Sequence, residues 1–360
     1  MKYSLFFLSY LPIVLLLIFT FVKRRKRQVS PMPLSVVALL ELCLVIYIAF
    51  YPPELTADKM DYYYRFLNID QTYDISEYKD PGWMIYMRLC HLLTFGNVYV
   101  FFIITASIYV LSYYFFAKRY LPKYTIGYFI VMSAGCLGFF NYGTNVIRNG
   151  VAIALLFFAV SLKFKLPIRI AIIVAALLIH KSVFIPLFAF FAAFYLKKEK
   201  TALYIWLLCL FLSIIEINLE PIFETVGFID QRIVSYGASI NSESSYEKGF
   251  RLDFLLYSVA PIIIAFYYKR KKYKINTLYW QVFRAYLLSN SIWLLAIRIA
   301  YSDRLAYLSW FMIPFVTLYP VAYEPSRFRN PQIFLLRVMY LFMGVSVALG
   351  IRSMLKGTVI

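Results

Sequence analysis

Two stretches of this chain place an arginine or a histidine where an apolar run begins or ends. Arg148 and Asn145 lie in the Asn- and Gly-rich residues 141–150, which lead into an apolar run. His180, one of only 2 histidines, ends the apolar residues 171–179. A guanidinium has forked donors that match phosphate oxygens, and a neutral imidazole can act as a general base or donate a hydrogen bond to a phosphate. Both stretches therefore predict contact with a phosphorylated substrate.

A structural role is the alternative for each of these residues. An arginine at the end of an apolar run can snorkel, with its stem in apolar surroundings and its head in water. Snorkelling does not account for the Asn- and Gly-rich residues around Arg148. A lone histidine in an apolar setting is commonly structural, and we interpret His91 in this way. For His180 both interpretations stay open.

A denser polar group lies in residues 298–307, between two long apolar runs. It contains Arg298, Tyr301, Asp303 and Arg304. The two arginines supply further donors for an anion. The alternative is an Asp303–Arg304 or Asp303–Arg298 pair that only clamps the turn.

A fourth group combines carboxylates with aromatic rings. Asp58 and Asp61 are followed by three consecutive tyrosines, which end at Tyr64, and then by Arg65. Sugars suit such a surface, because their C–H faces stack on rings and their hydroxyls donate to carboxylates. The alternative is an interfacial tyrosine belt, which is common in membrane proteins and plausible in a chain with 33 tyrosines.

The elements that must position these residues follow from composition. Hydrophobic residues make up 62% of the 360 positions, and charged residues make up only 15%. A soluble core could not hide so much apolar surface. The recurring apolar runs predict an all-α fold, a polytopic helical bundle of the bacterial inner membrane.

Basic residues predict the orientation of this bundle. Six short connections hold 21 of the 37 Lys and Arg residues. The acidic residues in or beside these connections are only Glu199 and Glu324. These connections are residues 23–27, 118–123, 163–169, 197–200, 269–274 and 327–329. Short connections rich in Lys and Arg stay on the cytoplasmic side. The net charge of +19 then follows from topology and anionic lipid headgroups, and it gives no support to nucleic-acid binding.

Alternation from the six connections predicts about twelve transmembrane helices with both termini outside. The predicted spans are residues 5–22, 34–51, 98–117, 124–140, 144–162, 166–180, 182–196, 202–219, 253–268, 277–297, 305–322 and 332–350. A shorter apolar segment near residues 83–93 is predicted as a half-inserted or interfacial helix. The larger outer loops are residues 52–82 and 220–252, and residues 1–360 are predicted to form a single integral membrane domain.

Nothing in the sequence points to a metal or a cofactor. The four cysteines, Cys43, Cys90, Cys136 and Cys209, lie in or beside apolar runs without CxxC or Cys/His spacing. A Walker loop, a dinucleotide fingerprint and a nucleophile elbow are all missing from the sequence. We expect no metal and no cofactor.

All four polar groups fall on the same outer face of a topology that was built from the basic connections alone. Three outward arginines and a histidine match a dianion. A pyrophosphate headgroup attached to a lipid is the natural dianion at that depth. The sequence therefore predicts one outward pocket for a lipid-linked pyrophosphate.

The order of these motifs resembles the EpsG family of Wzy-type polysaccharide polymerases. The resemblance rests on the helix that opens with Arg148, the Ala-rich run that ends in His180, and the later Tyr301-Ser302-Asp303-Arg304; it covers roughly residues 30–350. It implies an enzyme that joins polyprenyl-pyrophosphate-linked oligosaccharide repeat units at the outer face of the inner membrane, making O-antigen, capsule or exopolysaccharide. It also implies that membrane lipid, a flippase and a chain-length regulator are partners.

The expected reaction is glycosyl transfer from the lipid-linked growing chain to a lipid-linked repeat unit. Arg148, Arg298 and Arg304 are expected to stabilise the leaving pyrophosphate without a metal. His180, Asp61 or Asp303 is expected to accept the hydroxyl proton. The other residues expected to bind substrate are Asp58, Tyr64, Asn145 and Tyr301.

Other functions stay open. A flippase for the same lipid-linked oligosaccharide would need charges on both sides of the midplane and two related halves, and the sequence shows neither. A membrane O-acyltransferase would draw its acyl donor from inside. An O-antigen ligase-type transferase differs only in its acceptor, so the sequence alone does not separate it from a polymerase.

Overall fold

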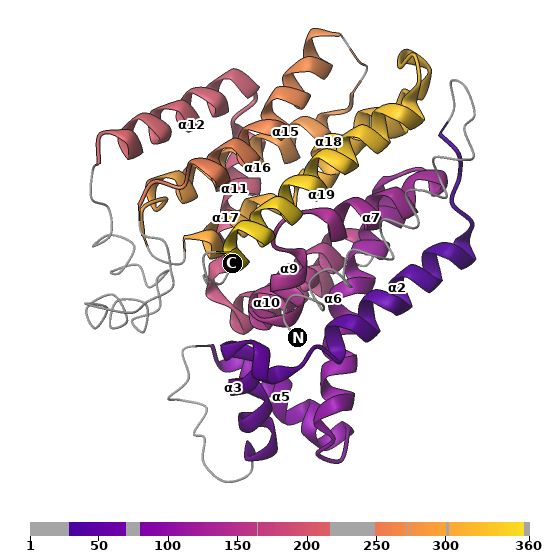
Figure 1. Ribbon diagram of the computed structural model, residues 1–360, viewed down its shortest axis with the longest axis vertical. Helices are drawn as coiled ribbons and strands as arrows, with labels where there is room; N and C mark the ends of the chain where they lie inside the picture. Colours follow the sequence, from indigo (N-terminus) through magenta and orange to yellow (C-terminus); the bar gives the residue numbers. More distant parts are fainter. Residues whose placement is uncertain are drawn as a thin grey trace. The chain divides into compact units, whose positions relative to one another are not determined.

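The computed structural model describes residues 29–69, 80–163, 165–216, 249–271, 273, 275–299 and 302–355. Within these residues every regular element is a helix, as Figure 1 shows, and this confirms the predicted all-α class. The predicted span 5–22, Tyr301 and most of the predicted outer loop 220–252 lie outside the described residues.

The described residues form fifteen α-helices along the chain. They are α2 (Leu34–Ala49), α3 (Ala57–Leu67), α5 (Pro81–Leu93), α6 (Val98–Tyr120), α7 (Ile126–Gly135), α8 (Phe139–Thr144), α9 (Ile147–Ser161), α10 (Leu166–Ile179), α11 (Phe184–Tyr195), α12 (Glu199–Ile214), α15 (Leu252–Arg270), α16 (Thr277–Leu295), α17 (Asp303–Trp310), α18 (Ile313–Tyr323) and α19 (Pro331–Leu355). Short 3-10 turns lie at Pro53–Leu55, Lys123–Thr125, Lys181–Val183 and Pro325–Arg327.

Four helical stretches of the described residues are long and apolar enough to cross a membrane. They are α6, α15, the pair α17 and α18, and α19. Helices α2, α9, α10 and α11 are apolar but shorter. The predicted number of about twelve transmembrane helices therefore stays a prediction. Helix α5 forms where the interfacial helix is predicted, and its position at a membrane surface stays a prediction too.

The predicted span 124–140 is interrupted in the structure. Helix α7 ends at Gly135, and α8 begins at Phe139 after a turn in which Gly138 has φ +94°. A left-handed φ suits glycine because it has no Cβ. Arg148 therefore follows a short separate helix, α8, rather than one continuous apolar helix.

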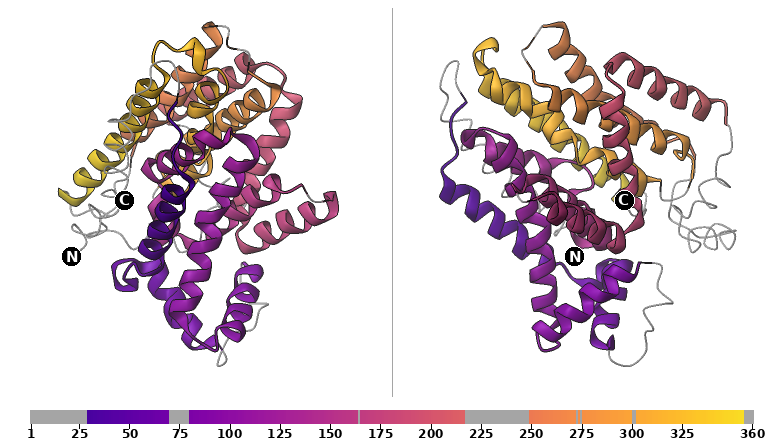
Figure 2. Two further views of the ribbon diagram at one scale, coloured as in Figure 1. Left: turned by 90° about the vertical axis from the view of Figure 1, so that its right-hand side faces the viewer. Right: turned by 180° about the vertical axis from the view of Figure 1, so that it is seen from behind.

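Residue packing divides the chain into two compact units, which we call the N-terminal unit (residues 1–183 and 328–336) and the C-terminal unit (residues 184–327 and 337–360). The predicted single membrane domain stays a prediction. In the N-terminal unit α6 packs against α2 and α9, and α9 packs against α10. Ala152 and Ala159 of α9 are fully buried, and such small residues let helix backbones approach closely. Helices α3 and α5 lie at the end where α6 begins (Figures 1 and 2).

In the C-terminal unit α16 packs against α11, α12 and α17. Its fully buried Asn290 joins three neighbouring helices. The indole of Trp206 in α12 donates to Asn290 Oδ1 at 2.8 Å, and Asn290 Nδ2 donates to Ser309 of α17 at 2.9 Å and to Ser258 of α15 at 3.2 Å. Because every polar atom of this amide is paired, the network stabilises one arrangement of α12, α15, α16 and α17.

Candidate functional site

Arg148 lies in the first turn of α9, and two partners fix its guanidinium. Nε donates to the Tyr62 hydroxyl at 2.7 Å, and Nη1 donates to Asp80 Oδ2 at 2.8 Å. The side chain is only 18% exposed, whereas a snorkelling head lies in water. Among the described residues Nη2 has no hydrogen-bond partner, so one edge of the fork can meet a ligand.

His180 directly follows α10, and the next turn of the chain holds its ring. The backbone N–H of Ser182 donates to His180 Nδ1 at 3.2 Å, and the Ser182 hydroxyl lies 2.8 Å from the same nitrogen. That hydroxyl also donates to Asn149 Oδ1 at 2.9 Å. A backbone N–H can only donate, so Nδ1 is an acceptor and the proton of a neutral ring lies on Nε2.

A close contact between α5 and α10 brings these two residues to the same end of the N-terminal unit. A Cβ added to Gly82 would lie 2.7 Å from the backbone carbon of Leu178, so the first turn of α5 touches the last turn of α10. Asp80 directly precedes α5, and His180 directly follows α10. The contact therefore places the Asp80–Arg148 ion pair beside the turn that holds His180.

The predicted carboxylate and tyrosine group lies on α3. Asp58 is close enough to Arg148 to favour its charge. Asp61 accepts a hydrogen bond from Arg65 Nε at 2.7 Å, and its side chain is 41% exposed. Tyr64 is exposed. The structure thus brings Asp58 to Arg148, while Asp61 forms a local pair and Tyr64 faces outward.

A fully buried lysine, which no local sequence pattern singles out, anchors α3. Lys59 Nζ donates to the carbonyls of Ile48 at 2.9 Å and Ala49 at 3.0 Å, in the last turn of α2. Carbonyls at a helix end lack partners inside the helix, and a cation there also complements the helix dipole. Nζ lies 4.5 Å from the centre of the Phe102 ring in α6. Lys59 therefore ties α3, which carries Tyr62, to the end of α2 and the beginning of α6.

Burial lowers the pKa of Lys59 to about 7, and the charge of Glu54 acts in the opposite direction. Below this pKa the folded protein carries a buried ammonium, whereas the unfolded chain stays protonated to a much higher pH. The unfolded state therefore binds more protons above pH 7, and the free energy of unfolding should rise with pH there. We expect the unfolding temperature of the wild type, relative to Lys59→Met, to rise between pH 7 and about pH 9. A difference that does not change over this range would contradict the assignment.

Four buried side-chain polar atoms in the N-terminal unit have no hydrogen-bond partner among the described residues: Glu41 Oε1, Trp83 Nε1, Thr94 Oγ1 and Asn145 Oδ1. The two that concern this site are Trp83 Nε1 and Asn145 Oδ1. The Trp83 ring centre lies 5.1 Å from that of Tyr62, the partner of Arg148. Asn145 directly follows α8, three positions before Arg148. An unpaired buried donor or acceptor destabilises a fold, and a ligand or water commonly satisfies it. Both atoms are therefore candidates to bind ligand hydroxyls.

The third predicted group lies in the C-terminal unit. Arg298 Nη2 lies 3.0 Å from Glu216 Oε1, and its Nε donates to the Ser213 carbonyl at 3.2 Å. Arg298 is thus engaged with the end of α12. The structure supports a pairing of Arg298 with Glu216, and not the alternative in which Arg298 clamps Asp303.

Asp303 begins α17 and is buried. Its carboxylate interacts with the charges of Arg304 and Arg251 and forms a hydrogen bond with Tyr307. The Asp303–Arg304 interaction, which is the structural alternative for this group, is therefore present, and Arg251 is an additional partner.

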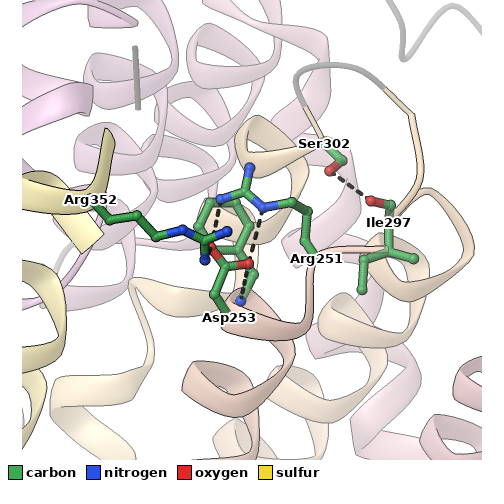
Figure 3. Close-up of polar contacts among 6 residues, drawn as sticks. Arg251, Asp253, Ile297, Ser302 and Arg352 are labelled. Carbon is green, nitrogen blue, oxygen red and sulfur yellow. Dashed lines mark hydrogen bonds and ion pairs between the residues drawn. The ribbon is translucent and has the colours of Figure 1, made fainter. Parts of the chain in front are cut away.

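Arg251 belongs to a second cluster that the sequence reasoning missed. Its Nε and Nη2 donate to the two carboxylate oxygens of Asp253 at 3.0 and 2.9 Å. Figure 3 shows Arg352 of α19 reaching the same carboxylate, at 3.4 Å. Arg352 and Asp253 are 99 positions apart, so they do not form a local sequence motif. Their positions near helix ends are the one signal in the sequence that could have indicated this cluster.

The described residues hold no group of three or more His, Cys, Asp or Glu side chains that could bind a metal. The expected lack of metal and cofactor stays a prediction. The structure brings Arg148, His180, Asn145 and Asp58 together in the N-terminal unit, and Arg298, Asp303 and Arg304 belong to the C-terminal unit. The single pocket predicted for both groups also stays a prediction.

Comparison with known proteins connects this geometry to a family. No curated protein and no solved structure matches the chain. The EpsG family model matches residues 38–352, which include both clusters. Together with the long apolar helices, this match indicates a membrane protein of polysaccharide biosynthesis. Because the match covers most of its length, the chain belongs to the EpsG family, a family of Wzy-like polysaccharide polymerases and exopolysaccharide biosynthesis proteins.

Proposed function

We propose that this protein is a polymerase that joins polyprenyl-pyrophosphate-linked oligosaccharide units at the outer face of the cytoplasmic membrane. The observation that carries the proposal is the fixed guanidinium of Arg148. Its bonds to Tyr62 and Asp80 orient the fork, and among the described residues its Nη2 group has no partner. A pre-oriented fork beside the His180 turn suits the oxygens of a pyrophosphate.

In the proposed reaction a hydroxyl of the incoming repeat unit attacks the anomeric carbon of the growing chain. The bond from that carbon to the pyrophosphate oxygen breaks, and the lipid pyrophosphate leaves with the electron pair. Arg148 stabilises the negative charge of the leaving group. Asp61 and Asp303 are the candidate acceptors for the hydroxyl proton. Trp83 Nε1 and Asn145 Oδ1 supply a donor and an acceptor for sugar hydroxyls.

The turn that holds His180 supports a role as a donor rather than as a base. The backbone N–H of Ser182 occupies the lone pair of Nδ1, so a neutral ring presents Nε2–H. A protonated Nε2 can donate to a phosphate oxygen, but it has no lone pair with which to accept a hydroxyl proton. His180 therefore adds a neutral donor next to the charge of Arg148.

Two amide substitutions test this role. A glutamine at position 180 can place its amide N–H near the position of Nε2, whereas the shorter asparagine reaches only the position of Nδ1. We expect His180→Gln to lower polymer yield by roughly tenfold or less, and His180→Asn by roughly 10- to 100-fold, the range for losing a hydrogen bond to a charged group. The measurement is the polysaccharide ladder from cells with matched membrane levels of each variant. Equal and complete loss in both variants would instead favour a general base.

The same gel separates the proposed reaction from transport. A polymerase defect leaves single repeat units, which were made and flipped, attached at the surface when a ligase is present. A flippase defect removes even the single-unit product. The expected pattern for both His180 variants is the single-unit product with fewer long chains, and its disappearance would favour the flippase.

A further inference from the structure

Asn149 directly follows Arg148 in the first turn of α9 and is almost completely buried, with 3% exposure. Its Oδ1 accepts a hydrogen bond from the Ser182 hydroxyl at 2.9 Å. Among the described residues its Nδ2 has no hydrogen-bond partner. An amide nitrogen carries two N–H donors, and buried donors without a partner destabilise a fold unless a ligand or water meets them. The Asn149 amide is therefore a candidate to bind a ligand.

The contacts of Ser182 fix which way this amide faces. The backbone N–H of Ser182 donates to His180 Nδ1 at 3.2 Å, so the hydroxyl proton is available for Asn149 Oδ1. With the amide turned over, Nδ2 would face the hydroxyl, whose proton would then compete with the backbone N–H for the one lone pair of Nδ1. The observed orientation gives each acceptor one donor. The two N–H donors of Asn149 therefore point away from Ser182.

Two backbone donors lie in the same turn of α9. The N–H groups of Ile147 and Gly150 bond to backbone carbonyls of the residues that precede α9, at 2.8 and 3.1 Å. Among the described residues the two N–H groups between them, those of Arg148 and Asn149, have no acceptor. Unpaired N–H groups and the positive end of the helix dipole favour an anion. The amide of Asn149 thus adds donors to a helix end that already suits a phosphate.

The side chains of Arg148 and Asn149 face different neighbours. Consecutive residues of an α-helix point about 100° apart. The Arg148 guanidinium lies against Tyr62 of α3 and against Asp80, which precedes α5. Asn149 lies against Ser182, in the turn that follows α10. The donors therefore form two groups on either side of the start of α9, and not one cluster.

We propose that Asn149 binds the second phosphate of the lipid pyrophosphate and makes the site select a diphosphate over a monophosphate. This inference rests on the proposed function, in which Arg148 holds the leaving group. A pyrophosphate has two phosphate groups joined through one oxygen, so it can meet both groups of donors at once. A monophosphate can meet only one of them. Ser182 is then a positioning residue, because it acts through the Asn149 amide.

The test compares two lipids on the full chain in nanodiscs of phosphatidylcholine. The probes are undecaprenyl pyrophosphate and undecaprenyl monophosphate, which share one tail and differ by one phosphate. Native mass spectrometry gives the dissociation constant of each lipid, and the wild type is expected to prefer the pyrophosphate. Asn149→Asp keeps the size of the side chain and an acceptor for Ser182 but has no N–H donor. Its affinity for the pyrophosphate should fall by roughly 10- to 100-fold, and the affinity for the monophosphate should fall less.

Ser182→Ala separates ligand binding from support of the fold. If Asn149 only fastened α9 to the turn after α10, Ser182→Ala would be the more harmful change, because Asn149→Asp still accepts from the hydroxyl. A role in binding predicts the opposite order. The preference for pyrophosphate should fall strongly in Asn149→Asp and less in Ser182→Ala, where the amide keeps its donors but is less fixed. Asn149→Ser also lacks Nδ2 and is neutral, so it should lose the preference without a new charge.

Asn97→Asp is the matched control. Asn97 precedes α6 in the same unit, and its Oδ1 accepts from the backbone N–H groups of Tyr99 and Val100 at 3.0 and 3.2 Å. Aspartate caps a helix about as well as asparagine does, so this variant makes the same change from amide to carboxylate without loss of a proposed donor. It should keep the preference of the wild type.

An unchanged preference in both Asn149→Asp and Asn149→Ser, or an equal loss of affinity for both lipids, would overturn the inference. Equal displacement of the pyrophosphate probe by phosphatidylglycerol, a membrane lipid with one phosphate, would overturn it in favour of a general headgroup site. The proposed function fails separately, through long polysaccharide ladders in Arg148→Gln. Short ladders in Arg148→Gln with an unchanged preference in the Asn149 variants would retain the polymerase and reject the selection.

Discussion

Arg148→Lys should shorten the polysaccharide to mainly single repeat units, although it preserves the charge. The arginine donates to Tyr62 and Asp80 from two different nitrogens and can still offer Nη2 to a phosphate. One ammonium cannot reproduce this fork. A lost hydrogen bond to a charged group corresponds to about 1.5–3 kcal/mol, so we expect roughly a 10- to 100-fold lower polymer yield. The measurement is a gel of extracted polysaccharide.

The matched control for this substitution is Arg327→Lys. Arg327 also pairs with one carboxylate, that of Glu324, but the pair is local along the chain and its arginine is 43% exposed. Such pairs contribute little, and lysine can replace arginine in them. The control should keep long ladders at the same membrane level of protein. Long ladders from Arg148→Lys would rule out the assigned role of the Arg148 fork.

Gly82→Ala is the second substitution with a large expected effect. The added methyl would lie 2.7 Å from both the backbone carbon and the Cβ of Leu178. Backbone atoms cannot give way as a flexible side chain can, so α5 must move away from α10. Overpacking of this kind costs about 1–3 kcal/mol. Because Asp80 directly precedes α5, the shift should also loosen its ion pair with Arg148.

We expect Gly82→Ala to lower both the unfolding temperature of the purified protein and the polymer yield. The control is Gly344→Ala in α19, where, among the described residues, no atom beyond the adjacent backbone of the same helix lies within 4 Å of the added Cβ. Alanine in place of glycine within a helix stabilises by about 1 kcal/mol, so the control should unfold at the same or a higher temperature. A Gly82→Ala protein that matches this control in both measurements would show that the α5–α10 contact is not needed.

The N-terminal cluster was partly predictable because two of its members stand at the ends of apolar runs. Arg148 and His180 could be found from local sequence, since a polar residue that borders an apolar run is visible without knowledge of the fold. Asp80 and Tyr62, the partners of Arg148, could not be assigned in this way. The ion pair joins residues 68 positions apart, and it depends on how α5 and α9 pack.

Lys59 shows the limit of sequence reasoning in another way. A lysine in a polar stretch beside Asp58 and Asp61 is typical of an exposed residue. It is fully buried here because two carbonyls at the end of α2 need donors and α3 folds back onto them. Residues 57–67 alone do not reveal this contact, because the acceptor carbonyls lie in another helix.

The sequence by itself determined the helical, membrane-type character of this protein and the residues that border its apolar runs. Both depend on composition and on periodicity within single segments, which are local properties. Only the tertiary structure decided which charges meet. Arg352 and Asp253 are 99 positions apart, and Arg298 turns to Glu216 although Asp303 is nearer along the chain. Ion pairs between segments depend on helix packing, and packing is decided by shape and burial over the whole unit rather than by the spacing of charges in the sequence.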